Sequence, residues 1–360
     1  MKNNRHDVRR TNLQSSSTGA TGYIGGEGLY ALYKAHPDWK FSVLVRNEEK
    51  GKPVQDAYPN INLVYGTLDD AQVIEDAAAD ADIVLHTADS SDHEVSARAI
   101  AKGILKGHDS SHPGYWIHIS GTGILCWYDM DNERYGEPPL AEQAYNDLEG
   151  VGRLLSLPDT AFHRDIDKIV LEAAAIKPDV MKIAIVCPPT IFGVGRGPAN
   201  TRSRQVPGLV EATLNKGFGP KIGTGTTEWD NVHVQDLSNL FVLLAENAAL
   251  GSKSQPSEEE IWGPKAYFLA ENGSHVWGEV ADWAAQEAAK KGYIEKAETK
   301  SLDVKEAEDM LGFQALSWGL NSKGKARRAK KFLGWEPTGE SLKDHMKELI
   351  DSEAKLMGKA

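Results

Sequence analysis

Three glycines near the start of the chain have the spacing of a turn that holds a pyrophosphate. Gly19, Gly22 and Gly25 lie in the segment TGATGYIGG. The first glycine lets the backbone turn, the second lets the main chain approach a pyrophosphate, and the third lets the next helix pack on a sheet. Free amides at the start of that helix would face the phosphates. The predicted dinucleotide-binding residues of this turn are Gly19, Ala20, Thr21, Gly22, Tyr23, Ile24 and Gly25.

The residue after the next expected strand bears on the type of dinucleotide. Residues 41–45 have the pattern of a short buried strand, and Arg46 follows them. Enzymes that use NAD usually place an acid there to bind both ribose hydroxyls, whereas an arginine favours the 2′-phosphate of NADP. Although Glu48 and Glu49 lie close by, we expect NADP(H) to be preferred over NAD(H).

The elements that must position these residues alternate between strands and helices. Apolar strand patterns and helical patterns succeed one another at 41–45, 61–66, 71–79, 83–87, 94–106, 115–120, 161–176 and 181–187. Repeated units of this kind predict an α/β fold with a doubly wound parallel sheet, whose ligands bind at the carboxyl ends of the strands. We therefore also assign Thr87 and Ala88, at one such end, to the cofactor site.

The strand expected before the glycine turn is anomalous. Residues 9–17 contain one large apolar residue, Leu13, where a buried parallel strand is normally an almost continuous apolar run. Each missing apolar side chain forgoes roughly 1.5 to 3 kcal/mol of burial. Two interpretations stay open. Either the start of the chain is altered or mis-assigned, or the polar residues form the strand and pair through their backbone.

The domain organisation follows from these patterns. We expect an atypical N-terminal segment at 1–17, a dinucleotide-binding domain at 18–190 and a substrate-binding lobe at 191–360. Some strands and helices of the last part should return to the first domain. A chain of 360 residues is long enough for two such lobes.

Composition limits the classes of function. The formal net charge of −12 argues against a nucleic-acid partner. No apolar run reaches the roughly 18 residues of a membrane span, and no secretory signal pattern follows the start. We expect a cytoplasmic protein that binds a small-molecule substrate and no membrane, with a homodimer as a candidate assembly. Cys126 and Cys187 form no CxxC pair, so buried thiols and no metal site are expected.

Several motifs together resemble the extended short-chain dehydrogenase/reductase superfamily, including its epimerase/dehydratase-like and atypical members. They are TGATGYIGG at 18–26, GTLDD at 66–70, CPPTIFG at 187–193, IGTG at 222–225, NVHVQD at 231–236 and FLGWEP at 332–337. The resemblance implies a Rossmann fold with a smaller C-terminal α/β substrate lobe. It also adds Leu68, Asp69, Pro188 and Thr190 to the cofactor-binding residues.

The same resemblance points to the catalytic positions. The family uses a Tyr and a Lys four residues later on one helix face, with a Ser or Thr at the tip of the fifth strand. The lysine binds the nicotinamide ribose and lowers the pKa of the tyrosine from about 10. Here Lys168 occupies the lysine position, and Ser120 and Thr122 fit the hydroxyl position, but Arg164 occupies the tyrosine position. An arginine stays protonated, so Arg164 could polarise a carbonyl or hold an anionic substrate but could not act as an ordinary acid or base.

Other side chains could supply the proton. His163 has a suitable ordinary pKa of about 6.5, but on an ideal helix it would point about 140° away from Lys168, which makes a structural role the simpler interpretation. Tyr128, Tyr135 and Tyr145 lie in or beside a polar stretch at 129–158 that we expect to be an exposed insertion near the strand tip.

The predicted function is that of an NAD(P)(H)-dependent oxidoreductase. A carbonyl or aldehyde reductase, or an alcohol dehydrogenase, acting on a small organic substrate fits the motifs best. A nucleotide-sugar epimerase or dehydratase is one alternative, and a non-catalytic NADP(H)-sensing regulator is another.

Overall fold

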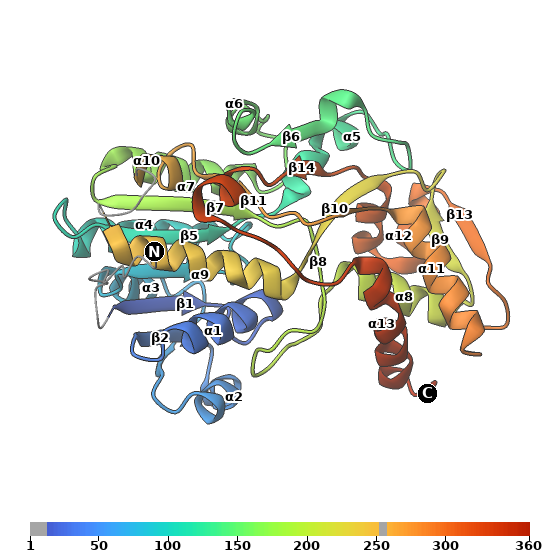
Figure 1. Cartoon of the computed structure of the whole chain (residues 1–360), viewed down its shortest axis with the longest axis horizontal. Coiled ribbons are helices and arrows are strands. Elements are labelled where there is room, and N and C mark those ends of the chain that lie inside the picture. The colour runs from blue at the N-terminus through green and yellow to red at the C-terminus, as the bar shows by residue number, and fades with distance from the viewer. Residues whose placement is uncertain (1–12, 252–257) are drawn as a thin grey trace, which may run out of the picture.

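A computed structural model describes residues 13–251 and 258–360. A parallel sheet of seven strands in the order β11–β7–β5–β4–β1–β2–β3 forms the centre of its first lobe (Figure 1). The strands are β1 (Gln14–Thr18), β2 (Lys40–Val45), β3 (Asn62–Tyr65), β4 (Ile83–His86), β5 (Gly114–Ile119), β7 (Met181–Cys187) and β11 (Tyr267–Leu269). The predicted α/β fold with a doubly wound parallel sheet is confirmed.

Helices cover both faces of this sheet. The first face packs against α1 (Tyr23–Ala35), α2 (Glu48–Ala57), α9 (Val234–Leu250) and α10 (Glu258–Ile261). The opposite face packs against α3 (Ala71–Ala79), α4 (Glu94–Gly107) and α7 (Arg164–Ile176). The strand order reverses between β1 and β4, and sheets of this type bind ligands in the crevice at the carboxyl ends of the strands there.

The central strand β1 consists of polar residues. Ser15, Ser16, Ser17 and Thr18 are 3%, 7%, 4% and 5% exposed. The strand pairs in parallel with β2 on one side and with β4 on the other, which bonds its backbone in both directions. Thr18 Oγ1 also accepts hydrogen bonds of 3.2 Å from the amides of Thr87 and Ala88.

This pairing decides between the two interpretations of the anomalous start. Residues 14–17 form the strand through their backbone, so this part of the expected N-terminal segment lies at the centre of the sheet. Residues 1–12 lie outside the described residues.

The second lobe lies to the right of the central sheet in Figure 1 and has its own apolar core, which includes Phe192, Leu209, Trp277, Trp318 and Ile350. Its elements are β8 (Thr190–Phe192), α8 (Gln205–Lys216), β9 (Gly219–Ile222), β10 (Glu228–His233), β12 (Ser274–Val276), α11 (Trp277–Lys290), β13 (Thr299–Leu302), α12 (Val304–Leu311), the 3₁₀ turn η4 (Phe313–Gly319) and α13 (Leu342–Leu356). Strands β12, β10 and β8 form one small sheet, and β13 and β9 form another. The π-helical turn η5 (Ala329–Leu333) precedes α13, and its Ala329 packs in the first lobe together with α9.

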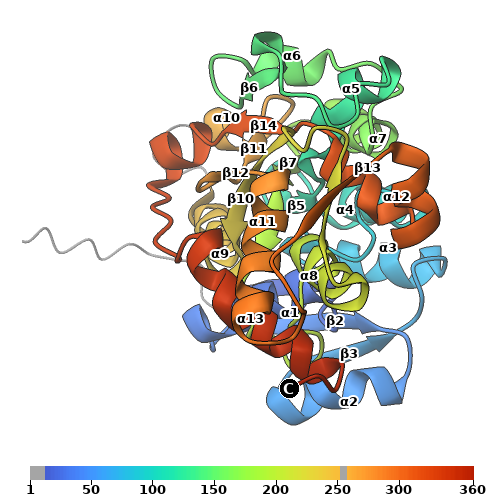
Figure 2. The same ribbon diagram turned by 90° about the vertical axis from the view of Figure 1, so that its right-hand side faces the viewer.

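The predicted domain boundary, between residues 190 and 191, falls at the start of β8, and both α9 and β11 return to the first lobe. Figure 2 shows the second lobe from the side, with α11 and α13 toward the viewer. The functional division into two lobes stays a prediction.

The stretch 129–158 is anchored rather than simply exposed. It contains α5 (Trp127–Asp131), the 3₁₀ turn η2 (Ala141–Gln143), β6 (Ala144–Asn146) and α6 (Val151–Leu155), and it follows the 3₁₀ helix η1 (Thr122–Cys126). β6 pairs with β14 (Lys323–Lys325), and Asp129 and Asp147 are fully buried.

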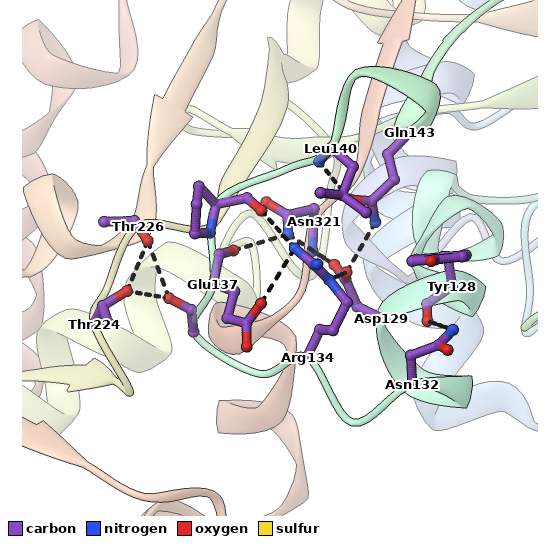
Figure 3. Close-up of polar contacts among 12 residues, drawn as sticks. Tyr128, Asp129, Asn132, Arg134, Glu137, Leu140, Gln143, Thr224, Thr226 and Asn321 are labelled. Atoms are coloured by element: carbon purple, nitrogen blue, oxygen red, sulfur yellow. Dashed lines mark hydrogen bonds and ion pairs between the residues drawn. The ribbon is translucent and has the colours of Figure 1, made fainter.

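The carboxylate of Asp129 is the centre of a polar cluster that fixes this insertion (Figure 3). It accepts hydrogen bonds from Arg134 Nε (3.2 Å), from Gln143 Nε2 (2.9 Å) and from the backbone and side-chain nitrogens of Asn321 (2.9 and 2.7 Å). Because Asn321 lies just before β14, the cluster ties the insertion to the C-terminal part of the chain.

Cys126 and Cys187 are free and buried, as expected, and burial raises the pKa of both thiols. Within the described residues, no helix combines the length and the apolar character needed to cross a bilayer.

Candidate active site

A cavity of about 530 Å³ opens at the carboxyl ends of the central strands. One wall is the glycine turn between β1 and α1, and another is made by the ends of β2, β3 and β4. Residues between β8 and the start of α8 complete it on a further side. The size is typical of a small-molecule or cofactor site.

The residues of this cavity fit a dinucleotide. A Cβ on Gly19 would lie 2.5 Å from Thr87 Oγ1, and a Cβ on Gly25 would lie 2.3 Å from the Gly19 carbonyl oxygen, so both positions require glycine. Gly22 caps α1 without a side-chain bond, and the first residues of the helix line the cavity, so their amides are available to an anionic group there. These groups would hold the pyrophosphate.

Most of the residues predicted to bind the cofactor line the cavity. They are Gly19, Thr21, Gly22, Tyr23, Ile24, Gly25, Arg46, Leu68, Thr87 and Ala88. The others lie elsewhere. Ala20 is buried. The cavity is lined by Pro189 and Ile191 rather than by the predicted Pro188 and Thr190. The exposed Asp69 pairs with His93 at 3.4 Å.

Arg46 is exposed at the end of β2. The Arg46 guanidinium forms no ion pair with any described residue, so its charge is available to an anionic ligand. Asn47 is occupied, because its side chain accepts a hydrogen bond of 2.9 Å from Lys50 N and caps α2. Among the described residues that line the cavity, Asp89 is the sole acid.

The helix face that carries Arg164 and Lys168 does not point into this cavity. Arg164 is 7% exposed, and its guanidinium donates to the Leu155 carbonyl (2.6 Å) and to Tyr267 Oη (3.4 Å). Lys168 lies nearer the surface and pairs with Asp159 at 3.0 Å. Two of its donor nitrogens, Nη1 and Nη2, are therefore engaged away from the cleft, and Nε is buried without a hydrogen-bond partner. The polarising role of Arg164 stays a prediction. The catalytic role of Lys168 stays a prediction.

A buried carboxylate explains why an arginine is accommodated here. Asp167 is fully buried on α7 and accepts a hydrogen bond of 2.7 Å from Tyr267 Oη. Burial raises the pKa of Asp167 to about 6, while the neighbouring hydroxyls of Tyr267 and Ser120 and the charge of Arg164 oppose that shift. Arg164 and Asp167 thus belong to the packing between α7 and β11.

His163 occupies a different position from the one expected on an ideal helix. The helix α7 begins at Arg164 rather than near 161, and His163 caps it with a left-handed backbone (φ 65°). This conformation turns the imidazole to the tip of β5, where a Cβ on Gly123 would lie 3.2 Å from His163 Nε2. The assumption that His163 is part of the helix was wrong. A catalytic role of His163 stays a prediction.

Asp92, in the loop after β4, holds this imidazole. Its Oδ1 lies 2.7 Å from His163 Nδ1, and the two side chains are 54% and 20% exposed. Burial lowers the pKa of His163, but the hydrogen bond and charge of Asp92, with the charges of Asp167 and Asp165, outweigh it and leave the pKa above its ordinary value. In turn, the bond to His163 lowers the pKa of Asp92.

The two hydroxyls predicted at the strand tip are buried beside this pair. Ser120 is 6% exposed and lies close to Asp167 and Cys187. Thr122 is 4% exposed, and its carbonyl accepts a hydrogen bond of 2.7 Å from Ser322 Oγ. Their roles in catalysis stay predictions.

Comparison with known proteins agrees with this geometry. Residues 19–138 match a family model described as NAD(P)H-binding. A dTDP-glucose 4,6-dehydratase of Bacillus anthracis, solved in complex with NAD, has a TM-score of 0.66 at 14% identity, over 95% of this chain and 97% of that one. A UDP-glucose 4-epimerase of Thermotoga maritima has a TM-score of 0.61 at 14% identity, over 96% and 100%. These structures share the fold.

A relative in sequence covers nearly the whole chain. Oxidase ucsJ from an Acremonium species is 37% identical over 344 residues, which are 95% of this chain and 98% of that protein. The chain belongs to the same family as this oxidase, and it shares the fold of the epimerase and dehydratase structures. The family model that matches residues 19–138 supports a nicotinamide dinucleotide as the cofactor.

Two parts of the site were missed from the sequence. Asp92 is 71 residues from His163 and belongs to no motif. Asn200, Arg202, Ser203, Arg204 and Gln205 line the cavity from a segment without a recognised pattern. The cluster of three arginines between 196 and 204 was the one local signal that could have indicated an anion-binding segment.

Proposed function

We propose that this protein is an NAD(P)(H)-dependent oxidoreductase that interconverts a carbonyl group and an alcohol on a small organic substrate. The observation that carries the proposal is the His163–Asp92 pair beside the tip of β5, on the same edge of the sheet as the dinucleotide cavity. The name of the 37% identical relative, an oxidase, supports redox chemistry.

When bound, the cofactor supplies or accepts a hydride at its nicotinamide ring. His163 would handle the accompanying proton through Nε2, because Nδ1 is engaged by Asp92. A protonated His163 can donate to a carbonyl oxygen, and a neutral His163 can accept the proton of an alcohol. Asp92 fixes the ring orientation and stabilises the imidazolium form. Ser120 and Thr122 remain the candidate hydroxyls for orienting the substrate oxygen.

We further propose that NADP(H) is preferred. Arg46 lines the cavity at the end of β2 with its charge unpaired among the described contacts, and a 2′-phosphate would give it a charge-assisted partner.

The test measures turnover of NADPH and NADH with a panel of aldehydes, ketones and nucleotide sugars. His163→Asn should lower kcat by at least about 100-fold, the usual contribution of a general acid, while NADPH affinity is retained. The control is His112→Asn, an exposed histidine before β5 and therefore at the opposite end of that strand.

Three results would contradict the proposal. An unchanged kcat in His163→Asn would exclude this residue as the acid. Tight NADPH binding without turnover on any substrate would favour the non-catalytic regulator, and activity confined to nucleotide sugars would favour the epimerase or dehydratase.

A further inference from the structure

Residues 193–205, which we call the strap, cross over the glycine turn from the second lobe. Tyr23 Oη, at the start of α1, donates a hydrogen bond of 2.6 Å to the Gly193 carbonyl. Asn200 N lies 3.3 Å from the Thr21 carbonyl of the turn. A Cβ on Gly197 would lie 2.7 Å from the Gly26 Cα, so the two backbones are in close contact. The strap is thus packed directly on the phosphate-binding elements.

A buried carboxylate pins the strap to α1. Glu27 is 0% exposed and accepts from the Arg196 amide (2.6 Å) and from Arg196 Nε (2.9 Å), and it also pairs with Arg196 Nη2. Ser238 Oγ, on α9, donates to the same carboxylate at 3.0 Å. The Arg196 guanidinium lies 4.5 Å from the centre of the Tyr30 ring.

The other end of the strap is tied to the C-terminal helix. Arg202 Nε and Nη2 donate to the carboxylate of Glu353 on α13 at 2.7 and 2.9 Å, and Nη2 also reaches Glu211 on α8 at 3.1 Å. Arg202 is therefore already neutralised. Arg204 is exposed and lines the cavity. Its side chain forms no hydrogen bond or ion pair with any residue of 13–251 or 258–360.

The charge of the cavity lining differs from that of the whole protein. The chain carries a formal charge of −12, yet the lining contains Arg46, Arg202 and Arg204 against one acid, Asp89. Arg46 lies at the adenosine side of the site, whereas the strap touches the glycine turn, where a pyrophosphate would lie.

We propose that the strap is the second wall of the dinucleotide site, that Arg204 binds the pyrophosphate of the cofactor from the side opposite the glycine turn, and that Glu27 is a positioning residue that holds the strap closed. The inference rests on the nicotinamide cofactor of the proposed function but not on the hydride transfer. Release of the cofactor then requires the strap to lift, which breaks the contacts between Glu27 and Arg196.

The first test measures NADPH dissociation by stopped-flow fluorescence in the absence of substrate. Arg196→Gln and Glu27→Gln should each raise the dissociation rate at least about tenfold, as expected for loss of a charge-assisted contact, with little change in the association rate. Ser238→Ala is the matched control, because it removes a bond to the same carboxylate from the α9 side and leaves the strap contacts intact. Unchanged dissociation in Arg196→Gln, a variant that does not alter α1, would overturn the strap assignment.

The second test uses cofactor fragments. Arg204→Gln should weaken binding of ADP at least about tenfold and leave binding of 2′-AMP unchanged, because ADP has the diphosphate and 2′-AMP has only the 2′-phosphate. A loss confined to 2′-AMP, or no loss for either fragment, would overturn the role of Arg204. Since both tests measure binding alone, they stay valid if the protein turns over no substrate.

Discussion

At the residue scale, the most informative side chain is His163, since its backbone conformation and its partner are both unusual. A left-handed φ of 65° is uncommon for a residue other than glycine, and here it directs the imidazole to the reactive edge of the sheet. Asp92 keeps the pKa of this imidazole above its ordinary value against the opposing effect of burial.

This arrangement predicts the pH dependence of the reaction. Carbonyl reduction needs protonated His163, so its rate should fall as the pH rises through the pKa of His163. Asp92→Asn removes the charge that raises this pKa, so the fall in rate should begin at lower pH. The rate at neutral pH should then be lower by about tenfold or more. Steady-state rates across pH check this. Ser91→Ala is the control, since Ser91 Oγ contacts the other oxygen of Asp92 at 3.0 Å. If the rate falls at the same pH in Asp92→Asn as in the unaltered protein, the titrating group is not His163.

Arg46 gives a second prediction at this scale. Arg46→Asp should reverse the preference for NADPH over NADH, because the lost charge-assisted pair contributes roughly 1.5 to 3 kcal/mol. Fluorescence titration with both cofactors measures the ratio of the two dissociation constants. Lys52→Asp changes the net charge equally on the exposed side of α2, where Lys52 pairs with Asp56, and should leave the ratio unchanged. Equal affinities in the unaltered protein would contradict the preference.

At the element scale, β1 shows how a polar strand can occupy the centre of a parallel sheet. Its backbone pairs on both sides, and Thr18 uses its hydroxyl to bond the loop after β4. Ser17 is different, since its Oγ is buried without a hydrogen-bond partner.

Replacing Ser17 and replacing Thr18 should therefore change the free energy of unfolding in opposite directions. Ser17→Ala removes an unpaired buried hydroxyl and should raise the free energy of unfolding by about 1 to 3 kcal/mol. Thr18→Ala leaves two amides without their acceptor and should lower it. Urea unfolding of the cofactor-free protein measures both variants. A destabilised Ser17→Ala would show that this hydroxyl has a partner such as bound water.

The insertion at 129–158 depends on one carboxylate. Asp129→Ala leaves donors from Arg134, Gln143 and Asn321 without their acceptor, which should cost about 3 to 5 kcal/mol of stability. Asp131→Ala, on the same helix, is the control because Asp131 is exposed and bonds only Thr160 among the described contacts. Equal unfolding midpoints for the two variants would refute the role of the Asp129 cluster.

At the scale of the whole molecule, the cofactor site joins the two lobes. The glycine turn comes from the first lobe, and the strap leads into α8 of the second. Bound cofactor should therefore stabilise both, and NADPH at about 100 times its dissociation constant should add about 2.7 kcal/mol.

Thermal unfolding followed by tryptophan fluorescence tests this coupling, because Trp116 lies in the core of the first lobe and Trp277 and Trp318 lie in that of the second. A single transition should shift to higher temperature with NADPH. Gly22→Val is the control, since its side chain would occupy the space of the pyrophosphate and abolish the shift. Two separate transitions, of which NADPH moves one, would contradict the coupling.

Much of this protein is determined by local sequence. The glycines at 19, 22 and 25 specify the turn, the alternation of apolar patterns specifies the parallel sheet, and the end of β2 places Arg46 at the cavity, because each depends on backbone geometry or on periodicity within a short stretch. The polar residues 14–17 were harder to interpret, since strand pairing by the backbone leaves no apolar pattern.

Only the tertiary structure decided which side chains face the site. The start of α7 set the direction of His163, and the bond to Asp92 spans 71 residues. Arg164 and Lys168 are four residues apart on α7, but neither side chain lines the cavity. Arg164 bonds Tyr267 and Leu155 instead, and Lys168 pairs with Asp159. The contact of Glu27 with Arg196 spans 169 residues. Such contacts depend on how loops from separate strands meet at one edge of the sheet, and no local pattern in the chain encodes that meeting.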